Sequence, residues 1–157
     1  MTKRTINFAL FAFLYVAFLA WYDGWGSSPM TAVEVEGYLA SLPVNGEGAT
    51  FAAPLRKLGE NDDGDEVFML NLNRYDYAEG EAQSGPPANY QAYGRSVIPM
   101  VLSRAGHPVY SGRFLIDRMV GGAQAQAWDE IILVRYRSRR DFLSMVTSKA
   151  YQAIAQR

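Results

Sequence analysis

An apolar run near the start of the chain constrains everything that follows it. Lys3 and Arg4 precede a largely apolar segment from Ile6 to Tyr22. At about 1.5 Å of rise per residue, a helix over this segment would cross most of a hydrocarbon core about 30 Å thick. The basic end of a first hydrophobic segment normally stays in the cytoplasm. Residues 1–26 therefore predict a cytoplasmic stub and a single-pass anchor in a bacterial-type inner membrane, with the rest of the chain on the periplasmic side.

Aromatic residues mark the far end of this segment. Trp21, Tyr22 and Trp25 are the amphipathic rings expected at a membrane interface. A cleaved signal peptide is the alternative, because it also begins basic and continues apolar. Its cleavage site needs small residues at alternating positions. Ala20 could precede the cut, but Phe18 is too large for the position two residues earlier, so we expect a retained anchor.

The apolar run has two different sides when it is drawn as a helix. At about 100° per residue, its small residues gather on one side and its bulky residues on the other. Small residues let helix backbones approach closely within lipid. The small side therefore predicts contact with the helices of other membrane-protein subunits. The small side holds Ala9, Ala12, Val16 and Ala20, and the bulky side holds Phe8, Phe11, Tyr15, Phe18 and Leu19.

Composition excludes several classes of function. The formal net charge is −1, so no overall positive field attracts nucleic acid. Without cysteine the chain has no disulfide, thiolate ligand or thiol nucleophile, and His107, its one histidine, cannot form a multi-histidine metal site. No dinucleotide-binding or phosphate-binding glycine motif is present. We therefore expect no cofactor and no metal.

Residues 27–64 predict a helical linker. Thr31, with Glu34 three residues later, forms the pattern of a capping box, and the helix that it begins ends at Pro43. Residues 46–50 read as a loop, followed by one or two helical turns over residues 51–58. The acidic run at residues 60–66 fits a calcium loop poorly, because Gly59 falls where the first carboxylate should be. It predicts a solvated turn before a strand.

Residues 65–157 predict an α+β domain. Val67 to Asn73 alternates between an apolar and a more polar side, which is typical of a half-buried strand. A loop and a helix capped by Gly106 follow, then a strand over residues 107–115 and another over 128–136. Ser138 with Asp141 opens a final helix. The helix that ends near Gly106 should bury Tyr90, Tyr93, Val97, Met100 and Val101. The final helix should bury Phe142, Met145, Val146, Tyr151 and Ile154.

The order strand, helix, strand, strand, helix predicts a ferredoxin-like layer without its closing strand. The loop around Gly121 and Gly122 would join the second and third strands as a hairpin. Helices on one face of a sheet leave the other face uncovered. A second copy, packed sheet against sheet, or a different subunit would have to cover it.

Several segments together resemble a small-domain family of unknown function. That family belongs to the dimeric α/β-barrel superfamily, which also holds antibiotic-biosynthesis and haem-degrading monooxygenases. The resemblance extends from about Glu66 to Arg157 and implies a ferredoxin-like fold and a tendency to form dimers, but no settled reaction. The segments that carry it are residues 69–75, Tyr93–Gly94, residues 128–130, residues 138–140 and residues 149–151.

The resemblance also gives an enzymatic interpretation. Relatives in the superfamily oxidise aromatic substrates, and His107, Asn71, Asn73 and Trp128 would line the corresponding polar cleft. Asn and Trp side chains can hold a substrate, and a histidine can remove a phenolic proton. The alternative is that His107 is a structural or surface residue. No base partner for it is visible in the sequence.

Four arginines, at positions 135, 137, 139 and 140, crowd the last strand and the start of the last helix. Cations at a helix N-terminus oppose the helix dipole. The last helix therefore does not explain why the arginines lie there. They form either a solvated basic rim or a contact with acidic lipid headgroups or a partner. Tyr75 and Tyr77 suit a contact surface or a core equally well.

The leading hypothesis from the sequence is a non-catalytic accessory subunit of a larger membrane complex. One alternative is a cofactor-independent monooxygenase-like enzyme at the membrane surface. Another is a module that binds a small aromatic compound, quinone, pigment or haem against Phe8, Phe11, Tyr15 and Phe18.

Overall fold

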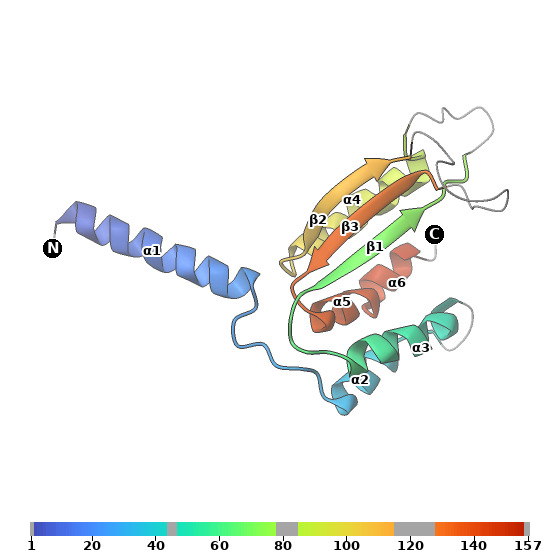
Figure 1. The fold of residues 1–157 in the computed structure, drawn as a ribbon, viewed down its shortest axis with the longest axis horizontal. Coiled ribbons are helices and arrows are strands. Elements are labelled where there is room, and N and C mark those ends of the chain that lie inside the picture. The colour runs from blue at the N-terminus through green and yellow to red at the C-terminus, as the bar shows by residue number, and fades with distance from the viewer. Residues whose placement is uncertain (1, 44–46, 78–84, 115–127, 156–157) are drawn as a thin grey trace.

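The computed structural model describes residues 2–43, 47–77, 85–114 and 128–155. In this part of the chain the fold is α+β, with one antiparallel sheet of three strands and six helices (Figure 1). The predicted hairpin loop at Gly121 and Gly122 lies outside the described residues. The elements are α1 Lys3–Tyr22, α2 Ala32–Leu39, α3 Glu47–Glu60, β1 Val67–Asn73, α4 Ala88–Leu102, β2 His107–Arg113, β3 Glu130–Tyr136, α5 Arg139–Val146 and α6 Lys149–Ala155.

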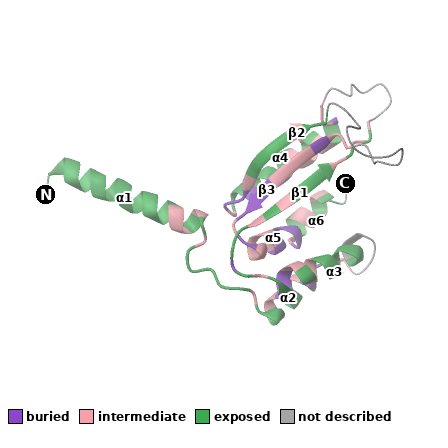
Figure 2. Ribbon diagram, in the orientation of Figure 1, coloured by how far each residue is buried: buried purple, intermediate pink, exposed green. Residues whose placement is uncertain are grey.

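Helix α1 projects from the rest of the molecule and ends at a glycine. It is long and apolar enough to cross a membrane, and none of its apolar window is buried (Figure 2). Gly24 has a φ of +67°, the left-handed conformation that glycine adopts without strain. The N–H of Trp25 donates to the carbonyl of Ala20 at 3.0 Å, the bond of a Schellman cap. The cap therefore stops α1 before the polar segment begins.

Helix α2 begins as the sequence predicts. Thr31 accepts from the N–H of Glu34 at 3.2 Å, and the Glu34 carboxylate accepts from the N–H of Thr31 at 3.3 Å, which confirms the capping box. The predicted loop at residues 46–50 is wrong, because α3 already begins at Glu47 and continues through Pro54. Two glycines in five residues suggested a loop, but packing of α3 against α2 outweighs their weak helix propensity.

The acidic segment after α3 is a turn, as predicted, but its key carboxylate is not solvated. The side chain of Asp62 is 1% exposed and accepts from the N–H of Met30 at 2.8 Å. It also lies 3.9 Å from the guanidinium of Arg139. No cluster of metal ligands occurs among the described residues. The carboxylate therefore ties the start of α2 to the end of α3.

Strand β3 lies in the centre of the sheet and pairs antiparallel with β1 and β2, in the order β1-β3-β2. The register places Phe68, Arg135 and His107 side by side at the end near α1. The next residues of β1 on this side of the sheet are Leu70 and Leu72. Since side chains alternate along a strand, this register assigns every paired residue of the sheet to one of two faces. Val109, at a register shift in β2, is not paired.

Within the described part of the chain, helices cover only one of these faces (Figure 1). The core forms between that face of the sheet and helices α4 and α5, and α6 packs against it. Leu143 of α5 is fully buried, and it also meets the α2–α3 pair near Gly59. The buried residues of the main cluster are Val97, Val101, Val134, Tyr136, Met145 and Val146.

The predicted cap of α4 at Gly106 is shifted by one residue. Ala105 takes the left-handed conformation, with a φ of 56°. The N–H of Gly106 donates to the carbonyl of Val101 at 3.0 Å. A Cβ at Gly106 would meet the Val101 side chain at 2.8 Å and the carbonyl oxygen of Arg135 at 3.0 Å. The glycine is therefore required for close packing, whereas Ala105 makes the turn.

Two helical glycines test whether the α2–α3 pair is a packed part of the domain. A Cβ at Gly59 would lie 2.8 Å from the Val35 side chain, whereas a Cβ at Gly37 would meet nothing within 4 Å. We expect Gly59→Ala to lower the free energy of unfolding by about 1–3 kcal/mol. Gly37→Ala should leave it unchanged or raise it by up to about 1 kcal/mol. Chemical denaturation measures both, and equal effects would contradict this packing.

The buried Tyr136 predicts sensitivity to alkali. Its side chain is 6% exposed, and burial raises the pKa of its hydroxyl to about 12. In the unfolded chain a tyrosine titrates near pH 10. A raised folded-state pKa contributes stability below the unfolded value, and this is lost as pH rises toward the folded value. We expect the free energy of unfolding to fall between about pH 10 and 12, and less steeply in Tyr136→Phe, as alkaline denaturation curves would show.

Candidate functional site: the anchor junction and the open face of the sheet

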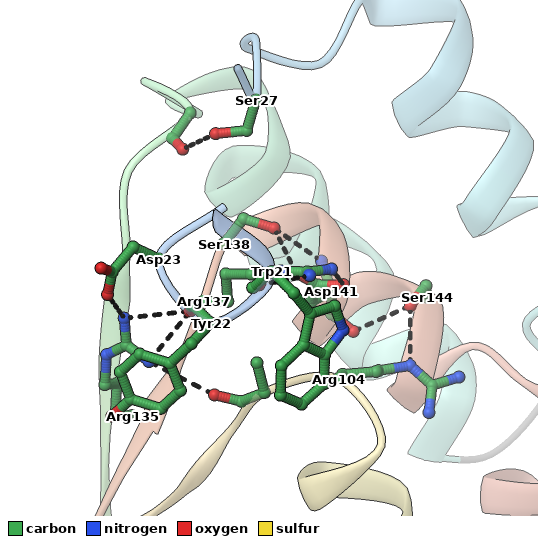
Figure 3. A network of polar contacts seen from close by, with 12 residues as sticks. Trp21, Tyr22, Asp23, Ser27, Arg104, Arg135, Arg137, Ser138, Asp141 and Ser144 are labelled. Atoms are coloured by element: carbon green, nitrogen blue, oxygen red, sulfur yellow. Dashed lines mark hydrogen bonds and ion pairs between the residues drawn. The ribbon is translucent and has the colours of Figure 1, made fainter. Parts of the chain in front are cut away.

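Two arginines at the end of β3 bind the carbonyl end of α1. Arg137 donates to the carbonyl oxygen of Trp21 at 2.8 Å, and both Nη atoms of Arg135 lie 3.5 Å from that of Tyr22 (Figure 3). The last carbonyls of a helix lack partners within it and carry its negative dipole end. No basic residue lies in the last turn of α1. The sheet therefore supplies the cations that this helix end lacks.

Arg135 is the more buried of the two. Its side chain is only 8% exposed and forms ion pairs with Glu66 and Asp23. Its guanidinium carbon lies 4.2 Å from the centre of the Tyr22 ring, a cation–π contact. It also donates to the carbonyl oxygen of Ala105 at 3.3 Å. One side chain thus joins α1, the segment before β1 and the turn before β2.

We call the contact between the end of α1 and the end of β3 the anchor junction. Arg137 extends it to the start of α5. Its guanidinium makes two hydrogen bonds to the Asp141 carboxylate, both at 2.8 Å. The Ser138 hydroxyl accepts from the N–H of Asp141 at 3.1 Å, which confirms the predicted start of this helix. A Cβ at Gly24 would lie 3.1 Å from the Arg137 side chain. The glycine that ends α1 therefore also makes room for Arg137.

All four arginines of the predicted basic rim are engaged within the chain. Arg139 pairs with Asp63, and Arg140 pairs with Glu34 at 2.9 Å. The hydrogen bond from Arg140 lowers the pKa of the Glu34 carboxyl below its usual range. The structure thus places these arginines in internal ion pairs that hold α1, α2 and the turn after α3 to the end of the sheet.

The uncovered face of the sheet is mostly apolar. We call it the open face. Beyond the row of Phe68, Arg135 and His107, its residues are aliphatic or aromatic except for Gly112. Four of its large side chains are 40% to 56% exposed. The apolar residues of the open face are Phe68, Leu70, Leu72, Tyr110, Ile131 and Leu133.

The alternation predicted for β1 is right, but the burial is the reverse of what it suggests. Phe68, Leu70 and Leu72 lie on the open face, and the helices cover the side with Met69 and Asn71. The apolar run Ile131–Val134 of β3 is typical of a strand covered on both sides, but among the described residues only one face of the sheet carries helices. An apolar surface of this kind marks a contact site in soluble domains.

A polar network lies at the end of the sheet remote from α1. The Glu130 carboxylate, in a residue that is 7% exposed, accepts hydrogen bonds from Tyr75, from Ser111 at 3.2 Å and from Asn73 at 3.4 Å. Asn73 also donates to the Tyr90 hydroxyl at 2.6 Å. Burial and, to a smaller extent, the hydrogen bond to Glu130 raise the pKa of the Tyr75 hydroxyl.

The structure does not bring the four predicted cleft residues together. Asn73 pairs with Glu130 at one end of the sheet, whereas His107 pairs with Arg135 at the other. Glu130 and Arg135 are five positions apart along β3, a distance of roughly 16 Å. The two residues also lie on opposite faces. The His107 Nε2 lies 3.4 Å from the Tyr22 hydroxyl, so the histidine belongs to the anchor junction.

The other two predicted residues lie elsewhere on β1 and before β3. Asn71 is exposed, and its amide lies 3.4 Å from the carbonyl oxygen of Ile132. Trp128 is half-buried at the start of the segment that leads into β3. The sequence pattern predicts burial of Tyr90 but no role for Glu130, since a single acid carries no spacing signal. The fold brings both residues to Asn73, which donates to Tyr90 and to Glu130.

Comparisons with known proteins give a likeness of structure without a function. No protein-family model and no curated protein matches the chain. The chain is similar to the RPA0582 protein of unknown function from Rhodopseudomonas palustris, with 26% identity, a TM-score of 0.54 and coverage of 72% of this chain and 83% of that one. The methylated RPA0582 protein gives 26% identity, a TM-score of 0.53, and coverage of 74% and 84%. The resemblance to the dimeric α/β-barrel superfamily stays a prediction.

The contacts of Arg135 at the anchor junction predict that its substitution destabilises the protein. Arg135→Gln removes the charge that holds Asp23, Glu66 and the Tyr22 ring, so we expect a loss of about 1–3 kcal/mol in the free energy of unfolding. The segment between α1 and α2 should also be cleaved faster by protease. Denaturation and timed proteolysis measure these effects. Arg95→Gln, at an exposed position of α4, is the matched control, and equal behaviour of the two variants would contradict the role of Arg135.

Proposed function

We propose that this chain is a membrane-anchored, non-catalytic accessory subunit of a larger membrane protein complex. Helix α1 would span a bacterial-type inner membrane once, with Lys3 and Arg4 in the cytoplasm and the α+β domain in the periplasm. The domain would dock through its open face on another subunit of the complex. The observation that carries this proposal is the exposure of an apolar sheet face directly beside the end of α1.

We propose further that the domain is a ferredoxin-like layer of the dimeric α/β-barrel type. The strand order β1-β3-β2, with α4 between β1 and β2, supports this assignment. In such a layer a fourth strand would lie beside β1, and the described residues place none there. A sheet with one bare face is a natural place for contact with another protein surface.

The anchor junction supports docking because it fixes the open face relative to α1. Tyr22, at the end of α1, touches both Arg135 and His107, which form the first row of that face. A domain on a free tether would lose more orientational freedom when it binds. The internal pairing of the four arginines favours this mechanical role over binding to lipid headgroups.

The small side of α1 provides the second contact in this proposal. Ala12 and Val16 lie in its middle, where a neighbouring transmembrane helix could approach closely. The bulky side, with residues such as Phe11 and Tyr15, would face lipid. The partner would therefore be a membrane protein that offers both a helix in the bilayer and an apolar surface above it.

The enzymatic alternative has less support. It needs His107 near Asn71, Asn73 and Trp128, and the sheet separates His107 from Asn73. The alternative in which the bulky side of α1 binds a quinone, pigment or haem rests only on the aromatic residues of that side. A second copy is the remaining occupant of the open face, and the experiment below separates it from a different subunit.

Purification of the full chain in a mild detergent tests the proposal. We expect other membrane proteins to co-elute in fixed stoichiometry. Leu70→Lys places a charge on the open face, and we expect roughly a tenfold loss of co-eluting partner because a charge would be buried without a counter-ion. Ile98→Lys, on the exposed side of α4, is the matched control and should retain the partner.

Recovery of the protein as a monomer or as a homodimer alone would overturn the proposed function. Equal retention of partner by the Leu70 and Ile98 variants would remove the open face from it. Ala12→Phe tests the second contact separately, because a bulky residue on the small side of α1 should weaken helix packing within the membrane. Phe11→Leu on the bulky side should leave that packing intact.

A further inference from the structure

An open cleft lies at the end of the sheet remote from the anchor. It is bounded by the segment after β1, the first half of α4 and the end of α6, and its volume is about 470 Å³. Three tyrosines, Tyr75, Tyr90 and Tyr93, form much of its lining. Two charged side chains, Arg74 and Asp76, line it as well. Both are exposed, so they are accessible to a dissolved ligand.

The tyrosines form a continuous aromatic wall. The ring centres of Tyr75 and Tyr90 lie 4.9 Å apart, and those of Tyr90 and Tyr93 lie 5.9 Å apart. The first pair of rings is tilted by 57°, so the wall is curved and not flat. The face of an aromatic ring carries negative potential and attracts cations. Quaternary ammonium groups are bound in this way.

A buried negative charge reinforces the wall. Tyr75 lines the cleft and donates its hydroxyl hydrogen to the Glu130 carboxylate. The other hydrogen-bond donors to that carboxylate, from Ser111 and Asn73, are neutral too. Arg113 of β2 lies opposite Glu130 in the register and offsets part of its charge. Because Tyr75 contacts the carboxylate directly, the Glu130 charge still adds to the field that favours a cation against the Tyr75 ring.

We propose that this cleft binds a small zwitterion with a quaternary ammonium group, such as a betaine. The ammonium group lies against Tyr75 and Tyr90, where the ring faces and Glu130 attract it. The anionic end of the ligand pairs with Arg74. Because the guanidinium binds carboxylates in a planar, two-point geometry, it selects a zwitterion over a simple cation.

This binding site is separate from the proposed docking function. The cleft lies beside Asn73, at the opposite end of the sheet from Arg135 and Tyr22, and its lining residues are not part of the open face. Failure of one proposal therefore leaves the other standing. In the proposed topology the cleft would open to the compartment outside the membrane.

Calorimetric titration of the full chain tests the inference. The protein is held in maltoside micelles, because phosphocholine detergents would themselves present the quaternary group. The probes are glycine betaine, choline and dimethylbutanol, the neutral carbon isostere of choline. We expect betaine to bind most tightly and choline next, with the isostere weaker than choline by roughly tenfold or more. Equal binding of choline and its isostere, or no binding of betaine, would overturn the proposal.

Two variants separate the ends of the ligand. Tyr75→Leu should weaken both charged probes by roughly tenfold, because it removes the ring that joins the wall to Glu130. Arg74→Gln should weaken betaine and strengthen choline, because it removes a charge that attracts one and repels the other. Tyr110→Leu, on the open face, is the control and should bind like the parent protein. Parallel losses of both probes in the Arg74 variant would exclude the proposed orientation.

Discussion

The attachment of α1 to the end of β3 is the contact on which the arrangement of the molecule depends. Only a short segment, residues 23–31, joins the helix to α2 along the chain. Arg135 and Arg137 add contacts to the helix end across more than 110 residues of sequence. They neutralise unpaired carbonyls at the negative end of the helix dipole, so the helix and the sheet stabilise one another. Their placement, which opposes the dipole of α5, is explained by α1.

This attachment also sets how the two proposed contact surfaces are arranged. Tyr22 faces the sheet, and on a helical wheel it belongs to the bulky side of α1 together with Phe18, on which its ring stacks. The small side, centred near Val16, is turned away from Tyr22 by about 125°. A partner helix against the small side would therefore not lie directly below the open face. The subunit would bridge two surfaces of a complex and not extend a single one.

The sequence predicted those features of the fold that depend on neighbouring residues. The capping box of α2, the Ser138 cap of α5 and the three strands each follow from a pattern within a few positions. It did not predict the start of α3, the cap of α4 or the buried side of β1, because packing against distant segments decided each of them. For the same reason the pairing of Arg135 with Tyr22 carries no local signal. The candidate site consists almost entirely of such distant pairs.

The order of residues along the open face indicates that protein, and not lipid, would cover it. The row nearest to α1 contains Arg135 and His107, and Tyr22 packs on both. Residues on the same side of a strand are two positions, or about 7 Å, apart. The apolar rows at Leu70 and Leu72 therefore lie about 7 Å and 14 Å farther along the strands. In the proposed topology the row with Arg135 and His107 would stand nearest to the headgroups, and the apolar rows would lie farther from the end of α1. Lipid would reach the row with Arg135 and His107 before the apolar rows, so another polypeptide surface explains burial of the apolar side chains better.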